Sequence, residues 1–353
     1  MQHSAPRALR VLRLVLALFS LCWLSACGDG PLVRQESFVF GTRVEVVSFG
    51  TPEAQARTAL SLVLREFDRL HRRYHAWQES DLTRLNAAFA NGRSEEVGDE
   101  MLFLLQRAQE YARRGDGLFE PAIGHLITLW GFHGDSFTPR RPDPAALRAQ
   151  TAARPRVTDL RIDGHRVSSA NRAVALDLGG IVKGYALDRA AQILREHGVR
   201  NALINIGGNV MALGSKGGQP WMVGIQHPRE AGPIGTLPLY DGEAIGTSGD
   251  YQRFFELDGQ RFSHLIDPAT GEPAHHTQAV TVLVTPRAQA GLVSDVASKP
   301  IFLAGDAGWR EMARRCGVDD VMRVDAAGRI FLTAGLQGRL RWAPGMHADS
   351  VLE

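Results

Sequence analysis

The sequence is poor in cysteine, and no two cysteines are left to pair once its N-terminal segment is removed. Among 353 residues there are three, Cys22, Cys27 and Cys316. The first two lie within, or at the end of, a segment typical of an export signal, which leaves Cys316 alone. An intrachain disulfide framework is therefore excluded, although exported proteins often rely on one.

A long apolar run is missing even at the N-terminus. Three arginines precede an apolar stretch from Leu14 to Leu24, which leads into the sequence LSAC ending at Cys27. That stretch is well short of the roughly 20 residues that a membrane-spanning helix needs. Basic residues, a short apolar segment and small residues before a cysteine instead predict a bacterial lipoprotein signal over 1–26, with lipid on Cys27. We then expect an exported protein anchored on the periplasmic side of a membrane, with the inner membrane favoured.

An excess of charge of one sign is also missing. The chain has 40 basic and 38 acidic residues, and the signal carries three of the arginines, which leaves 37 and 38. Nucleic-acid binding depends on a basic surface that neutralises phosphates. The balance therefore excludes an electrostatic nucleic-acid binder.

The remaining chain, 27–353, predicts one large mixed α/β domain with two lobes. Hydrophobic residues make up 44% of the sequence, ample for a sizeable core. Periodicity predicts helices over 52–72, 80–86, 101–114 and 180–197, and strands over 37–50, 157–162, 166–168, 173–177, 201–211 and 221–225. Hairpins rather than regular βαβ units disfavour a parallel doubly wound sheet. The Pro/Arg-rich stretch 137–157 is expected to be an exposed connection with a short helix.

The sequence FFELDGQRFSHLI predicts a hairpin in detail. Its Asp-Gly dipeptide at 258–259 is the strongest two-residue turn signal. Folding the chain there places an aromatic pair beside a charge pair, Glu256 opposite Arg261. The same register sets Arg253 against His264.

Two glycine-rich patches have both a functional and a structural interpretation. DLGGIVKGYALDRA carries Asp177 and Lys183 around a Gly-Gly turn, where main-chain N–H groups and the lysine could hold an anion. A purely structural turn explains the same residues equally well. INIGGNV, at 204–210, is better explained by a β-bulge or a bend.

Two further patches carry hydroxyls, a histidine and an acid. AIGTSGDYQRFF predicts Thr247 and Ser248 in a turn near His264, but no G-x-S-x-G elbow supports a serine hydrolase, so the hydroxyls are expected to donate to phosphate or flavin oxygens. His264 alone could be structural. SDVASKPIFLAG predicts Asp295 and Ser298 at the start of an apolar helix. This set suits Mg²⁺, and it suits equally an acid that stabilises a helix N-terminus.

The order of these motifs resembles the ApbE family. The succession runs FGTRVEV, SDLTRLN, GLFEPAIG, WGF, DLGGIVKGYALD, NIGGNV, GIQHPR, TSGDYQRFFELDGQRFSHLIDPATGEP and SDVASK. It covers essentially the whole mature chain. The resemblance implies an FAD:protein FMN transferase, which splits the FAD pyrophosphate, passes FMN to a threonine or serine hydroxyl of a partner protein and releases AMP. The implied acceptors are flavoprotein subunits of membrane respiratory or ion-pumping complexes.

The resemblance also implies the residues of an FAD cleft between two α/β parts. Together with Thr247, the implied FAD-binding residues are Phe40, Trp77, Phe119, Glu120, Asp177, Lys183 and Ile266. His264 matches the histidine suited to deprotonating the target hydroxyl. Mg²⁺ would be held by Asp295, Ser298 and the carbonyl of Gly180, where it would stabilise charge on the phosphate oxygens.

The sequence departs from the family pattern at Lys299, where a threonine is usual. A lysine offers Mg²⁺ no acceptor. Either Lys299 neutralises phosphate beside a single metal, or the metal site is degraded and transfer is slow or absent. The following Pro300 predicts a reshaped helix start. Two other functions stay open: a flavin-binding lipoprotein without chemistry, and an FAD pyrophosphatase that releases FMN and AMP.

Overall fold

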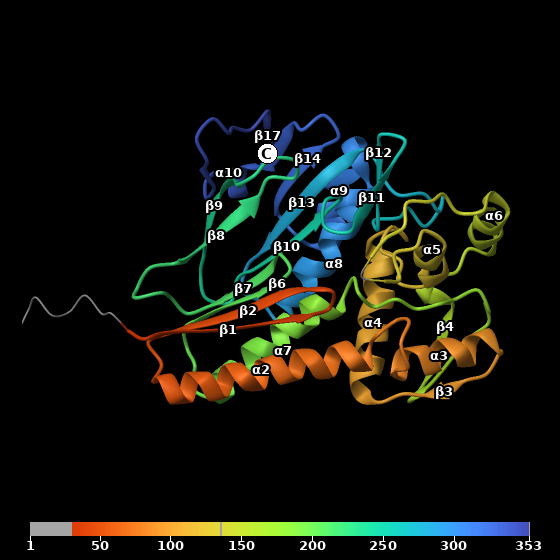
Figure 1. Ribbon diagram of the computed structural model, residues 1–353, viewed down its shortest axis with the longest axis horizontal. Helices are drawn as coiled ribbons and strands as arrows, with labels where there is room; N and C mark the ends of the chain where they lie inside the picture. Colours follow the sequence, from red (N-terminus) through yellow and green to blue (C-terminus); the bar gives the residue numbers. More distant parts are fainter. Residues whose placement is uncertain (1–29, 135, 353) are drawn as a thin grey trace, which may run out of the picture.

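The computed structural model describes residues 30–134 and 136–352, and its centre is a large mixed sheet (Figure 1). The strand order is β1-β2-β6-β7-β10-β13-β14-β15-β17. These strands are β1 (Leu32–Val39), β2 (Thr42–Phe49), β6 (Ala202–Ile206), β7 (Asn209–Leu213), β10 (Ala244–Gly249), β13 (Thr277–Val284), β14 (Asp320–Asp325), β15 (Ile330–Thr333) and β17 (Ser350–Leu352). Neighbours are antiparallel except for β15 and β17. The predicted mixed α/β class is confirmed, whereas the predicted signal and Cys27 lie outside the described residues.

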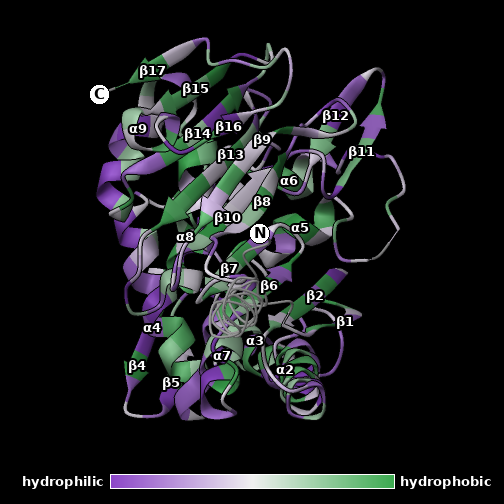
Figure 2. Cartoon of the chain, turned by 90° about the vertical axis from the view of Figure 1, so that its left-hand side faces the viewer, coloured by the Kyte–Doolittle hydropathy of each residue, from purple (hydrophilic) through white to green (hydrophobic). Residues whose placement is uncertain are grey.

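Both faces of this sheet are buried, because each is covered by a different layer. One face packs against α2 (Glu53–Arg73), α7 (Val182–Glu196), α8 (Ala290–Leu303) and α9 (Gly305–Cys316); the other faces the small sheet of β8 (Trp221–Gln226), β9 (Pro233–Leu239) and β16 (Arg341–Trp342). Alternate residues of a strand point to opposite faces. Accordingly Val280 and Val282 of β13 join the helix-side core, and Leu283 joins the other. Figure 2 shows hydrophobic and hydrophilic residues sharing helices such as α2.

A second lobe of helices and short strands adjoins the sheet (Figure 1). It contains α3 (Asp81–Ala90), α4 (Asp99–Arg114), α5 (Gly124–Leu129), α6 (Pro144–Ala153), the 3₁₀ turn η1 (Val157–Asp159), β3 (Glu95–Glu96), β4 (Leu160–Asp163) and β5 (Arg166–Ser169). Leu85 and Leu104 of this lobe belong to the same core cluster as Val44 of the sheet. A continuous core therefore joins the two parts, and α6 lies in the predicted connection.

The hairpin of β11 (Phe254–Leu257) and β12 (Gln260–Ser263) has the predicted register, with Glu256 opposite Arg261. Beyond the last pair, the main-chain N–H of His264 donates to the carbonyl of Arg253 at 3.1 Å. The hairpin packs on α5, where the rings of Trp130 and Phe262 stack with centroids 5.3 Å apart. This packing fixes the position of the chain that follows β12.

Four predicted strands are wrong in detail. The stretch 157–162 begins with the 3₁₀ turn η1, and only its second half belongs to β4. The stretch 37–50 is a hairpin, since Phe40 and Gly41 both have positive φ and turn the chain between β1 and β2. The stretch 201–211 is likewise a hairpin, β6–β7, turned at 207–208. The stretch 173–177 contributes only an isolated bridge from Ala175 to Ile123.

Two predictions near the expected site are also wrong. Thr247 and Ser248 lie within β10, paired with β13, rather than in a turn. Asp295 lies in the second turn of α8, which begins five residues earlier. Pro300 sits inside this helix and does not reshape its start, because the main chain of α8 continues through it, with Ala304 N–H donating to the Pro300 carbonyl at 2.9 Å.

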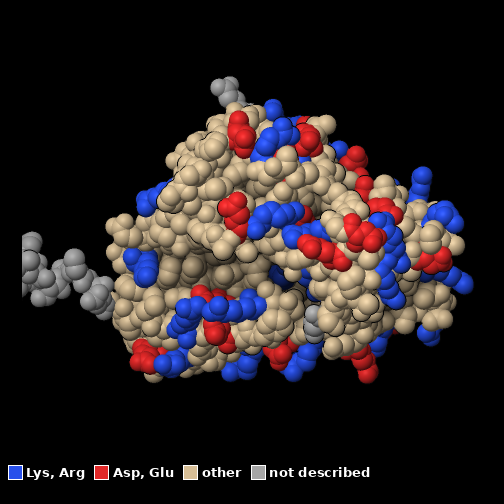
Figure 3. Space-filling view, turned by 45° about the horizontal axis from the view of Figure 1, so that its top comes forward, with Lys and Arg blue, Asp and Glu red and all other residues tan. Residues whose placement is uncertain are grey.

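The described helices include none that is both long and apolar enough to cross a membrane. On the face shown in Figure 3, basic and acidic side chains are interspersed rather than gathered by sign.

Candidate active site

A pocket of about 350 Å³ opens between the sheet and the second lobe. Figure 3 shows this face hollowed near its middle. The predicted FAD-cleft residues that line the pocket are Phe40, Trp77, Phe119, Glu120, Asp177, Lys183, Thr247 and Ile266, together with Gly180 and His264. The fold thus brings together residues that are up to 226 positions apart in the chain, from Phe40 to Ile266.

A second pocket, of about 430 Å³, adjoins the first on the side of β8. Lys183, Arg253 and His264 line both pockets. The imidazole of His264 therefore lies where the two meet, within reach of groups that enter from either side.

The turn that carries Phe40 has an unusual backbone. Phe40 has φ 57° and Gly41 has φ 67°, the left-handed pair that a two-residue hairpin turn requires. A bulky residue adopts this conformation only under constraint, and such strain is concentrated at functional sites. The ring of Phe40 lies 6.2 Å from that of Phe67 and 5.7 Å from that of His71, so aromatic packing holds it at the pocket.

The two predicted acids are already engaged with main-chain groups. Glu120 Oε1 accepts from the N–H groups of Ala122 at 3.0 Å and Val157 at 2.7 Å. Burial raises the pKa of Glu120 to about 7. Asp177 Oδ1 accepts from Gly179 N–H at 2.8 Å, and burial raises its pKa as well. Each carboxylate is thus held in place by main-chain N–H groups at the pocket wall.

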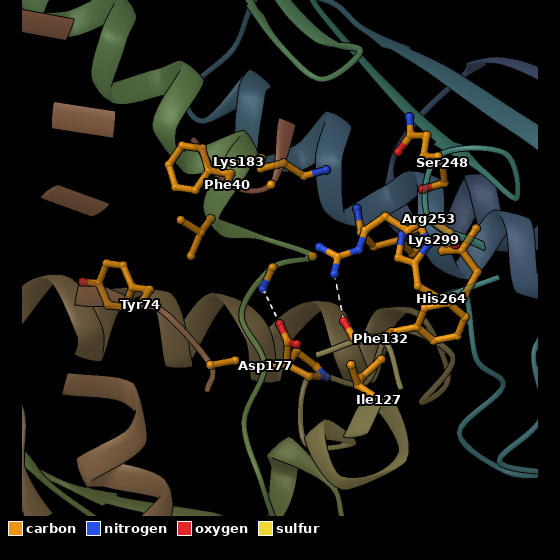
Figure 4. A pocket seen from close by; sticks show the side chains of 18 of the residues that line it. Phe40, Tyr74, Ile127, Phe132, Asp177, Lys183, Ser248, Arg253, His264 and Lys299 are labelled. Atoms are coloured by element: carbon orange, nitrogen blue, oxygen red, sulfur yellow. Dashed lines mark hydrogen bonds between the residues drawn. The ribbon is translucent and has the colours of Figure 1, made fainter. Parts of the chain in front are cut away.

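Three cationic side chains line the same pocket, Lys183, Arg253 and Lys299 (Figure 4). Burial lowers the pKa of Lys183, and the nearby Asp295 carboxylate counteracts this. Arg253 Nη2 donates to the carbonyls of Phe132 at 2.8 Å and Gly134 at 2.9 Å. The guanidinium is thereby held at the pocket wall. These three basic side chains, of which Lys299 is paired with Asp295, suit a polyanion such as a pyrophosphate.

Several lining residues were not predicted as site residues. Arg253 carried a usable signal, since the hairpin register had set it opposite His264. Tyr74 and Phe132 also line the pocket, as does Ser248, whose hydroxyl was already expected to donate to the ligand. Nothing in the local sequence separates the two aromatic residues from ordinary core residues.

His264 has a defined tautomer. Its Nδ1 lies 3.2 Å from the carbonyl oxygen of Arg253, which can only accept, so Nδ1 carries the hydrogen and Nε2 keeps a lone pair. Burial, reinforced by the charges of Arg253 and Lys183, lowers the pKa of His264 to about 3. The imidazole is therefore neutral at physiological pH, with no proton on Nε2.

The side chains expected to hold Mg²⁺, Asp295 and Ser298, lie together on α8, but the ammonium of Lys299 binds Asp295 instead. Asp295 and Ser298 are fully buried behind the pocket. Lys299 Nζ donates to Asp295 Oδ1 at 2.5 Å and to the Asp295 carbonyl at 2.7 Å. Asp295 Oδ2 accepts from Gly184 N–H at 2.8 Å. Both carboxylate oxygens are engaged, so these residues do not fit a metal as they stand.

The hydroxyls beside Asp295 are engaged too. Ser298 Oγ donates to the Asp295 carbonyl at 2.8 Å and lies 2.7 Å from Ser248 Oγ. This contact between α8 and β10 needs Gly246, because a Cβ there would collide with the main-chain oxygen of Ser294. Within 30–134 and 136–352, no cluster of three or more His, Cys, Asp or Glu could hold a metal ion.

Cationic, aromatic and imidazole side chains in one pocket of a mixed α/β fold suit a ligand that carries both phosphate groups and flat rings. The family model described as "ApbE family" matches residues 40–322. This protein belongs to the ApbE family, as its motif order predicted.

Relatives and solved structures agree with that assignment. An FAD:protein FMN transferase of Treponema pallidum is 34% identical over 345 residues, covering 91% of this chain and 93% of the relative. One of Rhodobacter capsulatus is 42% identical over 315 residues, 89% of this chain, and the match spans 60% of the relative's length. The ApbE protein of Thermotoga maritima superposes with a TM-score of 0.80 at 30% identity, covering 88% of this chain and 100% of the other.

Proposed function

We propose that this protein transfers FMN from FAD to a threonine or serine hydroxyl of an acceptor protein and releases AMP. The relatives named as FAD:protein FMN transferases support the donor and the transferred group. The observation that carries the proposal is His264, with a lone pair on Nε2, beside the cations Lys183 and Arg253 where two pockets meet.

The proposed reaction is a displacement at phosphorus. The acceptor oxygen attacks the phosphorus on the FMN side of the pyrophosphate, and a new P–O bond forms. The bond from that phosphorus to the bridging oxygen breaks, and AMP leaves with the electron pair. His264 takes the hydroxyl proton on Nε2 and later releases it to solvent. Lys183 and Arg253 counter the negative charge that develops on the phosphate oxygens.

The two pockets suggest separate places for FAD and for the acceptor hydroxyl. FAD has its phosphates beside the three cations of the first pocket, and its flat rings find aromatic partners such as Phe40 and Trp77. The acceptor hydroxyl has to reach His264 by a route that FAD does not fill. The second pocket, lined by Gly207, Gly224 and His264, offers that route.

Mg²⁺, which the resemblance implies, has no step in this mechanism. The Asp295 carboxylate is engaged by Lys299 and by a main-chain N–H group, so no oxygen of that carboxylate is left for the ion. A divalent ion would supply charge neutralisation at the pyrophosphate. In this chain, basic side chains are placed to supply it.

We also propose where the reaction takes place. The N-terminal sequence supports a lipoprotein anchored through Cys27 on the periplasmic side, with the inner membrane favoured. Acceptors within reach of such an anchor are exposed flavoprotein subunits of membrane respiratory or ion-pumping complexes. The anchor is tested by mass spectrometry of the protein isolated from bacterial membranes, which should detect lipid attached to Cys27.

The transfer is tested by mixing the protein with FAD and the exposed domain of such a flavoprotein subunit. We expect FMN covalently attached to one hydroxyl of the acceptor, detected by mass spectrometry of its peptides. The matched control is the same acceptor with that threonine changed to valine, which should stay unlabelled. Bound but intact FAD with every acceptor would indicate a flavin-binding lipoprotein, and free FMN with AMP would indicate a pyrophosphatase.

A further inference from the structure

The position of Lys299 suggests a function for this lysine in the transfer reaction. Lys299 lies one turn after Asp295 on α8, and its ammonium bridges the carboxylate and the main-chain carbonyl of Asp295. An ammonium has three N–H groups and no acceptor. Two of them point to Asp295, which leaves the third for an acceptor in the pocket that Lys299 lines (Figure 4).

The space around Lys299 fits its side chain closely. A Cβ on Gly180 would lie 3.0 Å from Lys299 Cε and 3.2 Å from Cδ, so the alkyl chain packs against the bare backbone of the glycine. Asp295 is fully buried, and the side chain of Lys299 is 17% exposed. The ammonium is therefore held by Asp295, and the exposed part of Lys299 lines the pocket.

Lysine is rare in this chain, which makes its placement informative. The sequence has three lysines among 40 basic residues. Lys183 and Lys299 line the pocket, whereas Lys216 is exposed in a turn. A lysine offers a compact point charge, unlike the broad planar guanidinium of arginine. Two compact cations thus stand where the pyrophosphate of the proposed function would lie.

We propose that the Lys299 ammonium replaces a divalent ion in this protein: it binds the FAD pyrophosphate directly, and transfer needs no metal on Asp295. This inference rests on the proposed function. Asp295 then has the role of holding the ammonium in place rather than of ligating a metal. As the P–O bond to the bridging oxygen breaks, Lys299 neutralises the charge on the phosphate of the departing AMP, and no other reactant is needed.

The test compares rates of AMP release from FAD, with the flavoprotein acceptor present, in EDTA and in Mg²⁺. We expect the wild-type protein to work equally well in both. Lys299→Thr removes the cation, frees Asp295 and adds an oxygen donor. Its rate in EDTA should fall roughly 100-fold, the effect of losing one charge-stabilising group, and Mg²⁺ should restore it. Lys216→Thr, the matched control, should behave like the wild type.

A second readout does not depend on turnover. Mn²⁺, titrated into the FAD-bound protein and followed by electron paramagnetic resonance, should bind Lys299→Thr but not the wild type. If Lys299→Thr does not fold, Lys299→Gln, which keeps approximately the side-chain length, replaces it in the titration. Wild-type activity that is lost in EDTA and regained with Mg²⁺, or Mn²⁺ binding that is equal in wild type and variant, would overturn the proposal.

These outcomes are separable from failure of the proposed function. If no AMP and no labelled acceptor form in EDTA or in Mg²⁺, the transferase proposal fails. The Mn²⁺ titration then still decides whether Lys299 occupies the cation position. If AMP release is strictly metal-dependent, only the inference about Lys299 fails.

Discussion

Two walls of the pocket are built from different parts of the core. The helix wall, Asp295, Ser298 and Lys299 on α8, belongs to the main hydrophobic core through neighbours such as Val296. The hairpin wall, which runs along β11 and β12 to His264, rests on a separate cluster of seven buried residues: Ile123, Leu126, Trp130, Phe132, Phe255, Phe262 and Ile266.

The difference lies in how the polar groups are held. On the helix wall the groups satisfy one another: Lys299 and Ser298 both donate to Asp295. On the hairpin wall, His264 is held by a hydrogen bond from its ring to a carbonyl and by aromatic packing, with its ring 6.4 Å from that of Phe132. The Lys299 ammonium sits on the helix wall, and the proposed general base, His264, sits on the hairpin wall.

The largest expected effect comes from His264→Ala. Removing a general base slows proton transfer by about 10²- to 10⁴-fold, so covalent labelling of the acceptor should fall by that range. FAD binding, followed by flavin fluorescence, should persist because the cations and aromatic residues remain. His347→Ala, at an exposed histidine, is the control. A variant that labels the acceptor at the wild-type rate would rule out His264 as the base.

Trp130→Ala should damage the hairpin wall selectively. Trp130 stacks on Phe262, and its Nε1 donates to the carbonyl of Gly271 at 2.7 Å. Loss of this buried ring should lower the free energy of unfolding by about 3–5 kcal/mol, measured in urea. Trp309→Ala, an equally buried tryptophan on α9, should cost similar stability but leave the transfer rate of folded protein unchanged. An equal loss of transfer rate in both variants would contradict the claim that the hairpin wall rests on its own part of the core.

Glu120→Gln should change how stability depends on pH. Burial raises the pKa of Glu120 to about 7, above its ordinary 4.5, so the folded state favours the protonated acid. Stability from this group is complete below pH 4.5 and is lost as pH rises toward 7, by roughly 3 kcal/mol at most at 1.36 kcal/mol per pKa unit. Glutamine does not ionise and should remove that loss. Urea unfolding at pH 5 and pH 8 measures the free energy of unfolding of each protein. Identical pH dependence in variant and wild type would refute the role assigned to Glu120.

The smallest effect concerns the pH profile of the reaction. With its pKa lowered to about 3, His264 stays neutral as pH falls through 6.5, so protonation of this residue should produce no acidic limb near 6.5. The profile of kcat/KM for FAD reports groups of the free enzyme and should be flat there. A limb near 6.5 in the wild type would show that His264 is less desolvated than the structure indicates.

The register of the hairpin wall was predictable from the sequence, whereas on the helix wall the sequence indicated the residues but not where their helix begins. The Asp-Gly turn at 258–259 sets a local register, and the pairs that follow depend only on neighbours in sequence. The family resemblance added the pocket residues, including Phe119 and Ile266, which lie far apart in the chain. The left-handed conformation of Phe40 could not be predicted from its residue type, because bulky residues rarely adopt positive φ.

The start of α8 escaped prediction because its cap comes from another helix. The carboxylate of Asp188, on α7, accepts from the N–H groups of Gly291 and Leu292 at 2.9 Å each. No residue near Gln289 signals this cap. The helix therefore begins earlier than its local sequence suggests, so that Lys299 lines the pocket from within the helix and Asp295 lies buried behind it. A contact between distant segments therefore determines where α8 begins, and local sequence patterns do not contain that information.

The most direct test of the transferase proposal is the ratio of AMP released to FMN bound covalently to the acceptor, measured in one time course with the wild-type protein and FAD. Transfer to a hydroxyl requires one AMP for each FMN attached. AMP accompanied by free FMN, or FAD that stays bound and uncleaved, would contradict it.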